Sequence, residues 1–348
     1  MHKWLLNECH IRLTVLVPGR LQVAAPREAA ERDKPGNLTQ VVRENGHLYI
    51  PGSSLKGVFR QRAEYIANLV NQTGLGSCHL FDSDLHQPTD DTEAYYRLAC
   101  GYRFNIRQQA YEAGKHPFTM AQRFKDACPA CQMFGHTLYA GHLRVTDFTA
   151  IDEERTTQLP HIALDRITNS VATRVSGAKA SNSGQLFTNE YVTQTCFTGN
   201  LILTNFTLWQ IGWLSYLLRD LQDGLIRIGH KRTSGAGQVE IQDTIVTLRQ
   251  LPTPANDFVN GVGRYLSPEQ RLAYGFAEEA PISISKLKWQ RDHQWHTTIL
   301  SPKQQQLLWQ ATRPLASAYL QQFDYPEAMT IPFLNELLQK HNEEVSHA

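Results

Sequence analysis

The sequence has almost no excess of charge of either sign. Its 348 residues include 34 lysines and arginines and 33 aspartates and glutamates, a formal net charge of +1. Hydrophobic residues make up 41% and charged residues 19%, which indicates a real core and excludes a highly charged disordered chain. A protein that holds nucleic acid by bulk charge alone is usually more basic. Any such binding must therefore depend on local cation clusters or be shared with neighbouring subunits.

Long apolar runs and a disulfide framework are also missing. No apolar run approaches the roughly 20 residues that a membrane span requires, and residues 1–8 lack the apolar core of a secretory signal. We therefore expect a cytoplasmic protein with no membrane partner. Six cysteines in a chain this long do not form a disulfide scaffold, and four of them fall between residues 78 and 131. Such clustering predicts a metal site.

The apolar pattern predicts one α+β core with insertions. The order strand, helix, strands, helix, strand is typical of a ferredoxin-like (RRM-like) βαββαβ fold. We expect helices over residues 53–70 and 208–221, and strands over residues 10–17, 142–148, 191–206 and 238–248.

The rest of the chain is less regular in sequence. Residues 25–47 predict a long polar loop, and residues 71–135 an irregular segment. Pro252 and Pro254 indicate a boundary. Beyond it we expect a strand near residues 288–300 and helices over 303–322 and 332–341, with no functional interpretation for this region.

The segment Ile50-Pro-Gly-Ser-Ser-Leu-Lys-Gly-Val-Phe-Arg60 places hydroxyls and cations at the start of the first helix. Unpaired N–H groups and the positive end of the helix dipole favour a phosphate there. The candidate phosphate ligands are Ser53, Ser54, Lys56 and Arg60. The alternative is an ordinary capped helix with two solvated cations.

A glycine-rich segment, Ile228-Gly-His-Lys-Arg-Thr-Ser-Gly-Ala-Gly-Gln-Val239, follows the second helix. Glycines allow close approach of another chain, and adjacent cations favour a phosphate. A dinucleotide-binding motif is excluded because these glycines follow a helix and precede a strand. The candidate RNA contacts are Gly229, Lys231, Arg232, Gly235 and Gly237, and the alternative is a simple helix-to-strand turn.

Cys128-Pro129-Ala130-Cys131 has the spacing with which two thiolates bind one Zn²⁺. Two further ligands are needed, and Cys78 and Cys100 are the nearest thiols. Alternative donors are His79, His86 and His116. A redox role is weakened by the lack of a surrounding thioredoxin-like pattern, and buried free cysteines are the other alternative.

Together with residues 159–169 and 185–192, which flank a small, polar stretch, these segments resemble the repeat-associated mysterious protein (RAMP) superfamily. The closest similarity is to type III CRISPR backbone subunits, the seventh Cas family, of a subtype D-like or divergent complex. The resemblance implies a core over residues 1–250, with a zinc-bearing insertion at 71–141 and a thumb hairpin at 165–191. Arg174 and Lys179 would contact phosphates from the thumb. Residues 251–348 would form a C-terminal extension of unknown role.

The implied function is to hold crRNA and the crRNA–target RNA duplex. The implied partners are crRNA, target RNA, the large signature subunit and neighbouring backbone subunits, and the implied cofactor is structural Zn²⁺. Relatives commonly carry a catalytic aspartate in the loop before the first helix, and Asp33 is the only aspartate there. Cleavage would leave 2′,3′-cyclic phosphate and 5′-hydroxyl ends, with a divalent metal such as Mg²⁺ as a further candidate cofactor.

The sequence leaves the catalytic assignment open. A gapless match to the family's arrangement around Gln40-Val-Val-Arg-Glu44 puts Leu38 where the acid belongs, so Asp33 fits only if the loop has extra residues. The alternatives are a solvated charge at Asp33, or Glu28, Glu31 or Glu44 as weaker candidates. A non-catalytic scaffold and a stand-alone RNA-processing nuclease are the competing functions.

Overall fold

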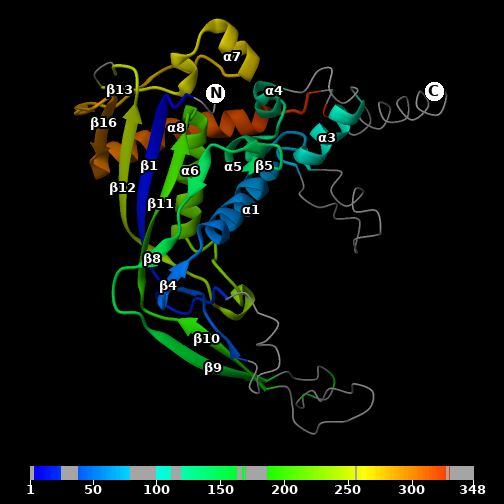
Figure 1. Cartoon of the computed structure of the whole chain (residues 1–348), viewed down its shortest axis with the longest axis vertical. Helices are drawn as coiled ribbons and strands as arrows, with labels where there is room; N and C mark the ends of the chain where they lie inside the picture. The colour runs from blue at the N-terminus through cyan, green and yellow to red at the C-terminus, as the bar shows by residue number, and fades with distance from the viewer. Residues whose placement is uncertain are drawn as a thin grey trace, which may run out of the picture.

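The computed structural model describes residues 4–24, 38–78, 99–110, 119–162, 167, 169, 186–254, 257–326 and 329. In this part the chain is a mixed α/β protein with a large antiparallel sheet, several helices and a smaller sheet that projects at one end (Figure 1). None of the described helices combines the length and apolar character needed to cross a membrane.

Three long strands form the centre of the large sheet. β1 (Asn7–Leu16) pairs antiparallel with β11 (Cys196–Thr204) on one side and with β12 (Glu240–Gln250) on the other. Side chains alternate along β1, so that Ile11 and Leu13 are buried while Arg12 is exposed. The strand order is β15-β16-β12-β1-β11-β8-β4-β3, and β7 also pairs with β11. The shorter strands are β3 (Arg43–Glu44), β4 (His47–Ile50), β7 (Leu143–Val145), β8 (Phe148–Ala150), β15 (Gln290–Asp292) and β16 (Trp295–Leu300).

Two helices were expected beside this sheet, and both form. α1 (Gly52–Val70) buries Leu55, Phe59, Ala63 and Ala67, which recur every four residues on one face. α6 (Leu208–Gln222) is buried on almost every side. It is covered by α8 (Pro302–Gln322), and the two helices meet at Gly212, where a Cβ would come 2.1 Å from the carbonyl oxygen of Thr312.

The C-terminal region is built onto the same core. β16 pairs with β12 and so continues the large sheet, and Leu300, Leu308 and Leu320 belong to the main hydrophobic cluster. The smaller elements of this region are β13 (Phe258–Val259), the 3₁₀ turn η3 (Val262–Tyr265), α7 (Pro268–Tyr274) and β14 (Ile282–Ser283). The helix expected over 332–341 lies outside the described residues.

Residues 71–135 are more regular than the sequence predicts. They contain α3 (Cys100–Ala110), α4 (Met120–Lys125) and α5 (Pro129–Phe134), and a small hairpin of β5 (Gly135–His136) and β6 (Tyr139–Ala140) follows. α4 and α5 span six residues each, which is too short for a visible helical period. Their caps define them instead, through a Thr119–Gln122 capping box and Cys128 before Pro129.

The small sheet consists of β2 (Leu38–Thr39), β10 (Leu186–Val192) and β9 (Thr156–Ile162), with β10 in the middle. β9 and β10 form a hairpin that extends below the large sheet in Figure 1. The single strand expected over 191–206 is divided into β10 and β11, and Gln194 in the break has a φ of 48°. Of the polar loop expected over 25–47, the structure describes residues 38–47, and these are not all loop: they contribute β2, β3 and the start of β4.

Candidate functional site

The start of α1 is held tightly against the large sheet. Gly52 N–H donates to Asp147 Oδ1 at 2.7 Å, and a Cβ at Gly52 would lie 2.5 Å from the carbonyl oxygen of Val145. The N-cap residue is Pro51, which has no side-chain cap hydrogen bond, so neither Ser53 nor Ser54 caps the helix. Ser53 is exposed and Ser54 half-buried. One N–H of this helix end is thus occupied by a carboxylate, while the serine hydroxyls do not serve as caps.

Lys56 and Arg60 lie one turn apart on the same flank of α1. The Arg60 guanidinium is held by protein groups, at 2.7 Å from Glu64 Oε1, 2.7 Å from the Gly135 carbonyl oxygen and 3.3 Å from Cys131 Sγ. Lys56 has no hydrogen-bond or ion-pair partner in the part of the chain that is described. Burial, and then the charge of Arg60, lower the pKa of Lys56 from its usual value. Lys56 is thus the available cation on this flank.

The glycine-rich segment, which contains the 3₁₀ turn η2 (Arg232–Ser234), packs directly on the backbone of residues 20–22. His230 N–H donates to the Gln22 carbonyl oxygen and Gly237 N–H to that of Arg20, each at 2.7 Å. A Cβ at Gly229 would lie 2.2 Å from the Gln22 carbonyl oxygen, and Gly229 has a φ of 78°. Close approach therefore requires glycine here. Lys231 and Arg232 are exposed, and Gly235 has open space around it.

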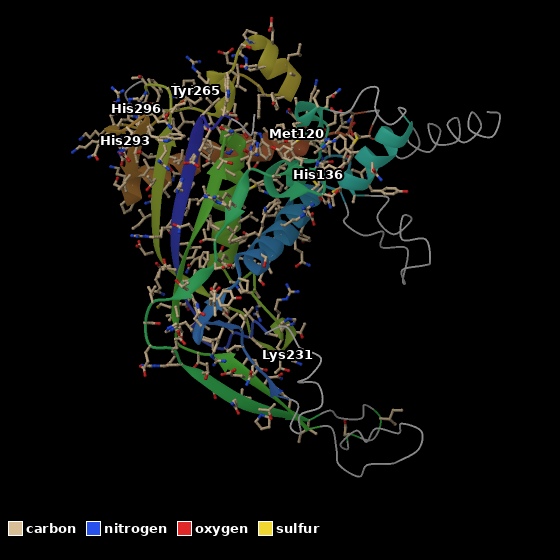
Figure 2. The ribbon with its side chains drawn as sticks, viewed as in Figure 1. Met120, His136, Lys231, Tyr265, His293 and His296 are labelled. Carbon is tan, nitrogen blue, oxygen red and sulfur yellow. The ribbon has the colours of Figure 1, made fainter. Side chains whose placement is uncertain are left out.

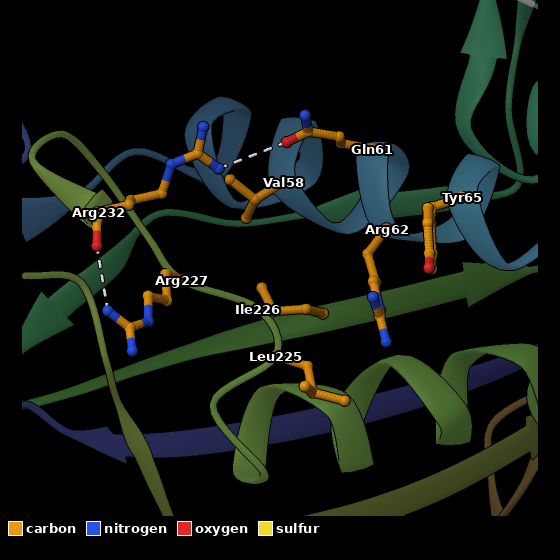
Figure 3. A pocket seen from close by; sticks show the side chains of 8 residues that line it. All are labelled: Val58, Gln61, Arg62, Tyr65, Leu225, Ile226, Arg227 and Arg232. Atoms are coloured by element: carbon orange, nitrogen blue, oxygen red, sulfur yellow. Dashed lines mark hydrogen bonds between the residues drawn. The ribbon is translucent and has the colours of Figure 1, made fainter. Parts of the chain in front are cut away.

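The other flank of α1 faces this segment across a pocket of about 210 Å³ (Figure 3). Arg232 Nη1 donates to Gln61 Oε1 at 3.4 Å and joins the two walls. The pocket is lined by four apolar or aromatic side chains, one amide and three guanidinium groups. They belong to Val58, Tyr65, Leu225, Ile226, Gln61, Arg62, Arg227 and Arg232. We name this the α1–loop pocket. The sequence placed Arg232 in the site but missed Gln61, Arg62 and Arg227.

The base of the polar loop lies beside the hairpin. Ala24 bridges to Val41, and Val42 N–H donates to the Val23 carbonyl oxygen at 2.9 Å. Arg43 then binds Glu190 of β10 with both guanidinium nitrogens, one of them 3.1 Å from Oε2. Burial acts to raise the pKa of Glu190, but the bonds from Arg43 and from Val41 N–H hold it below its usual value. The two flanks of the loop are therefore fixed to each other and, through Glu190, to the hairpin.

Several predicted site residues lie outside the described residues: Asp33, Arg174 and Lys179, the weaker acids Glu28 and Glu31, and the alternative donors His79, His86 and His116. Glu44 is exposed in β3. In Figure 2, Lys231 lies beyond the amino-terminal end of α1, whereas His136 lies near its other end.

The four predicted metal-ligating cysteines come together. The sulfur atoms of Cys78, Cys100, Cys128 and Cys131 all lie within 4.8 Å of one another, and all four residues are buried. Zn–S bonds of about 2.3 Å in a tetrahedron would put sulfurs about 3.8 Å apart, and Cys78 Sγ lies 3.5 Å from Cys131 Sγ. We call this group the cysteine cluster. It has the donor set and spacing to hold a metal ion.

The surroundings of the cysteine cluster offer donors to thiolate sulfur. Cys128 N–H points to Cys100 Sγ and Cys131 N–H to Cys128 Sγ, each at 3.4 Å, and Arg60 donates to Cys131. The hydroxyl of Tyr325, beyond α8, lies 3.9 Å from Cys100 Sγ. Such outer contacts orient metal ligands and tune their charge.

The thiols of the cluster cannot all ionise unaided. Contacts with Cys100 and Cys128 raise the pKa of Cys78 and of Cys131 well above the usual thiol value. At Cys128 burial acts to raise the pKa, but contacts with the neighbouring thiols lower it well below that value. A divalent cation is the kind of group that would allow all four to ionise together.

The chain matches the model of a known family. The family model of the RAMP superfamily matches residues 15–240, which is more than half of the chain. A search of curated proteins with the sequence of the chain finds no match. The matched range includes α1, the cysteine cluster, the hairpin and the glycine-rich segment.

We predict that the purified chain carries about one equivalent of tightly bound metal, held by four thiolates. Cys131→Ser should remove the metal and lower the thermal unfolding temperature, because no ion then links the segments that carry Cys78, Cys100 and Cys128. Cys196→Ser is the matched control, since Cys196 is half-exposed and outside the cluster. Metal content by plasma mass spectrometry checks this. Equal metal in both variants, or none in the unaltered chain, would contradict it.

Proposed function

The chain belongs to the RAMP superfamily, and from this membership we propose that it is a guide-RNA-binding backbone subunit of a type III CRISPR interference complex. The observation that carries the proposal is the placement of the glycine-rich segment against α1, with Arg232 bonded to Gln61 across a pocket lined by three arginines. A surface of this kind suits a sugar–phosphate backbone, which is recognised by cations and N–H groups. It also accounts for RNA binding at a net charge of only +1.

We infer a ferredoxin-like βαββαβ core over residues 1–250. The support is the antiparallel order β12-β1-β11-β8, in which α1 falls between β1 and β8 in sequence and α6 between β11 and β12. On this assignment, residues 71–141 are the zinc-bearing insertion, and β9 and β10 lead into and out of a thumb at 165–191. Residues 251–348 form the C-terminal extension, whose described part adds β16 and α8 to the core.

The metal of the cysteine cluster is, we infer, structural Zn²⁺. Four buried thiolates are the donor set of closed structural zinc sites, which leave no open position for catalysis. Around it, Arg60 connects the cluster to α1 and Tyr325 connects it to the chain beyond α8. The ion would thus hold together an insertion that has little hydrophobic core of its own.

Target RNA would be cleaved, if this subunit is catalytic, beside the hairpin. Cleavage requires the 2′-hydroxyl to be aligned with the scissile phosphate and a group that assists proton removal or holds a divalent metal such as Mg²⁺. The products would carry 2′,3′-cyclic phosphate and 5′-hydroxyl ends. Asp33 is the proposed acid. The loop that contains it is flanked by the Ala24–Val41 bridge and by the ion pair between Arg43 and Glu190 of the hairpin.

The proposed partners are crRNA, target RNA, the large signature subunit and neighbouring backbone subunits. A subtype D-like complex, in which several different backbone subunits each occur once, would suit the extra C-terminal region. The competing function is a non-catalytic scaffold that only shapes the guide–target duplex. A stand-alone RNA-processing nuclease is the other alternative, and activity of the isolated chain on repeat RNA would support it.

The guide-binding role predicts a loss of affinity when Arg227 and Arg232 are both changed to Ala. Binding of crRNA should weaken on the order of tenfold, and the slope of log K against log salt should fall by about one for each lost phosphate contact. Filter binding over a salt series measures both. Arg291→Ala, on the edge strand β15, is the matched control and should change neither. Identical salt slopes for the double variant and the unaltered chain would contradict the role.

The catalytic alternative is tested in the assembled complex with Asp33→Ala. We expect one or more cuts in target RNA to disappear while guide binding is retained, because the substitution removes an acid and no phosphate-binding cation. Denaturing gels of cleaved, end-labelled target provide the measurement. Asp292→Ala is the control, since Asp292 is an exposed acid in the edge strand β15. An unchanged cleavage pattern for Asp33→Ala would support the scaffold.

A further inference from the structure

The end of α8 and the residues that follow it, 319–326 and 329, pack beside the cysteine cluster, and we call this stretch the clasp. Met329 is fully buried in the same hydrophobic cluster as the four cysteines, and Phe323 and Tyr325 pack against that cluster. The Tyr325 hydroxyl lies 3.9 Å from Cys100 Sγ. None of these residues lines the α1–loop pocket. The contacts of the clasp therefore concern the cysteine cluster and not the proposed RNA-binding surface.

The segment that leads to Cys78 is bonded to the clasp through Asn71, a buried residue at the end of α1. Asn71 Nδ2 donates to the carbonyl oxygens of Leu320 and Phe323, at 2.9 and 2.8 Å. On its other side, Asn71 Oδ1 accepts from the N–H group of Thr73 at 3.0 Å. One buried amide thus joins the clasp to the turn that precedes Cys78.

The helix that begins at Cys100, α3, is bonded to the clasp through Arg103. Arg103 Nη1 donates to the Met329 carbonyl oxygen at 2.9 Å, and the Arg103 guanidinium lies over the Tyr325 ring at 4.4 Å from its centre. Arg103 is itself buried. It therefore holds two points of the clasp against the helix that supplies Cys100.

The start of α5, which carries Cys128 and Cys131, is bonded to the clasp through Tyr319. The Tyr319 hydroxyl donates to Gln132 Oε1 at 2.9 Å, and Gln132 Nε2 donates to the Ala127 carbonyl oxygen at 3.0 Å, directly before Cys128. Every segment that supplies a cysteine to the cluster is thus hydrogen-bonded, directly or through one side chain, to the same short stretch of chain.

A metal ion in the cysteine cluster would connect the same three segments through their thiolates. Two connections between the same parts stabilise each other, because each removes freedom that the other would otherwise have to remove. This coupling is reciprocal: the bound ion favours the docked clasp by the same factor as the docked clasp favours the bound ion.

We propose that the clasp forms the outer shell of the metal site and slows the loss of its ion, with the Tyr325 hydroxyl donating to the Cys100 thiolate. This inference rests on the proposed metal site and is independent of RNA binding. It gives the end of the described C-terminal region a role, because the insertion and the clasp are then each held in place by the other.

The first test loads the full chain with Zn²⁺ and follows transfer of the ion to an excess of the chromogenic chelator 4-(2-pyridylazo)resorcinol. Tyr325→Ala should speed the transfer about tenfold, the lower end of the effect of losing an outer contact. Tyr325→Phe removes only the hydroxyl and should speed the transfer less. Tyr265→Ala is the matched control, since Tyr265 is another half-buried tyrosine of the C-terminal region, whose hydroxyl donates to Gln250 at 2.6 Å. It should leave the rate unchanged.

The second test needs no substitution. Hydrogen–deuterium exchange of the unaltered chain is compared before and after the ion is removed, and amides of residues 319–326 should exchange faster without it, whereas those of β1 should change little. An increase no larger in the clasp than in β1 would overturn the proposal.

The transfer rates decide the proposal as well. Equal rates for Tyr325→Ala and the unaltered chain would overturn it, and so would equal acceleration by Tyr265→Ala, which would assign the effect to a general loss of stability. A rate for Tyr325→Phe equal to that of the unaltered chain would overturn the role of the hydroxyl. If the unaltered chain held no Zn²⁺, the metal site itself would fail, and the clasp with it, while RNA binding would be unaffected.

Discussion

The backbone of residues 20–24 holds the candidate site together. On one side its carbonyl oxygens accept His230 and Gly237 from the glycine-rich segment. On the other side, Leu21 exchanges two hydrogen bonds with Val192 of the hairpin, at 2.9 and 2.8 Å. Two parts of the chain that are distant in sequence are thus fixed relative to one another by one extended segment, which uses both its edges as a strand inside a sheet does. Both the glycine-rich segment and the hairpin are thus attached to the same short stretch of backbone.

The two flanks of α1 face two different sites. One flank faces the α1–loop pocket and its arginines, and the other sends Arg60 to Cys131 of the cysteine cluster. The cluster also contacts Tyr325, whose ring lies under the guanidinium of Arg103 at 4.4 Å. A metal ion there would connect α1, the segment of residues 78–131 and the C-terminal region. This offers a structural role for a part of the chain that has no functional signature in sequence.

Much of this arrangement could be predicted from the sequence, and the remainder could not for physical reasons. The period of Leu55, Phe59 and Ala63 predicts α1. The spacing of Cys128 and Cys131, with Cys78 and Cys100 as the nearest thiols, predicts the four cysteines that the structure brings together. Arg60 reads in sequence as a phosphate ligand. Its partners are Glu64, Gly135 and Cys131, because a helix flank can turn toward either neighbour and only packing decides which. The sequence did not identify Arg62 and Arg227 as site residues. They line the same pocket only because the turn after α6 brings residue 227 next to α1, and no local sequence pattern encodes a contact between segments so far apart in the chain.

The most direct test of the account is a crosslinking map of the intact complex assembled on guide RNA that contains 4-thiouridine. The peptides that carry RNA should come from two regions. One is residues 53–65, at the start and on the pocket-facing flank of α1, and the other is residues 225–237, which include most of the glycine-rich segment. Both should be found in the same preparation, because one groove presents them together. Crosslinks confined to the opposite edge of the large sheet, at residues 290–300, would contradict the account.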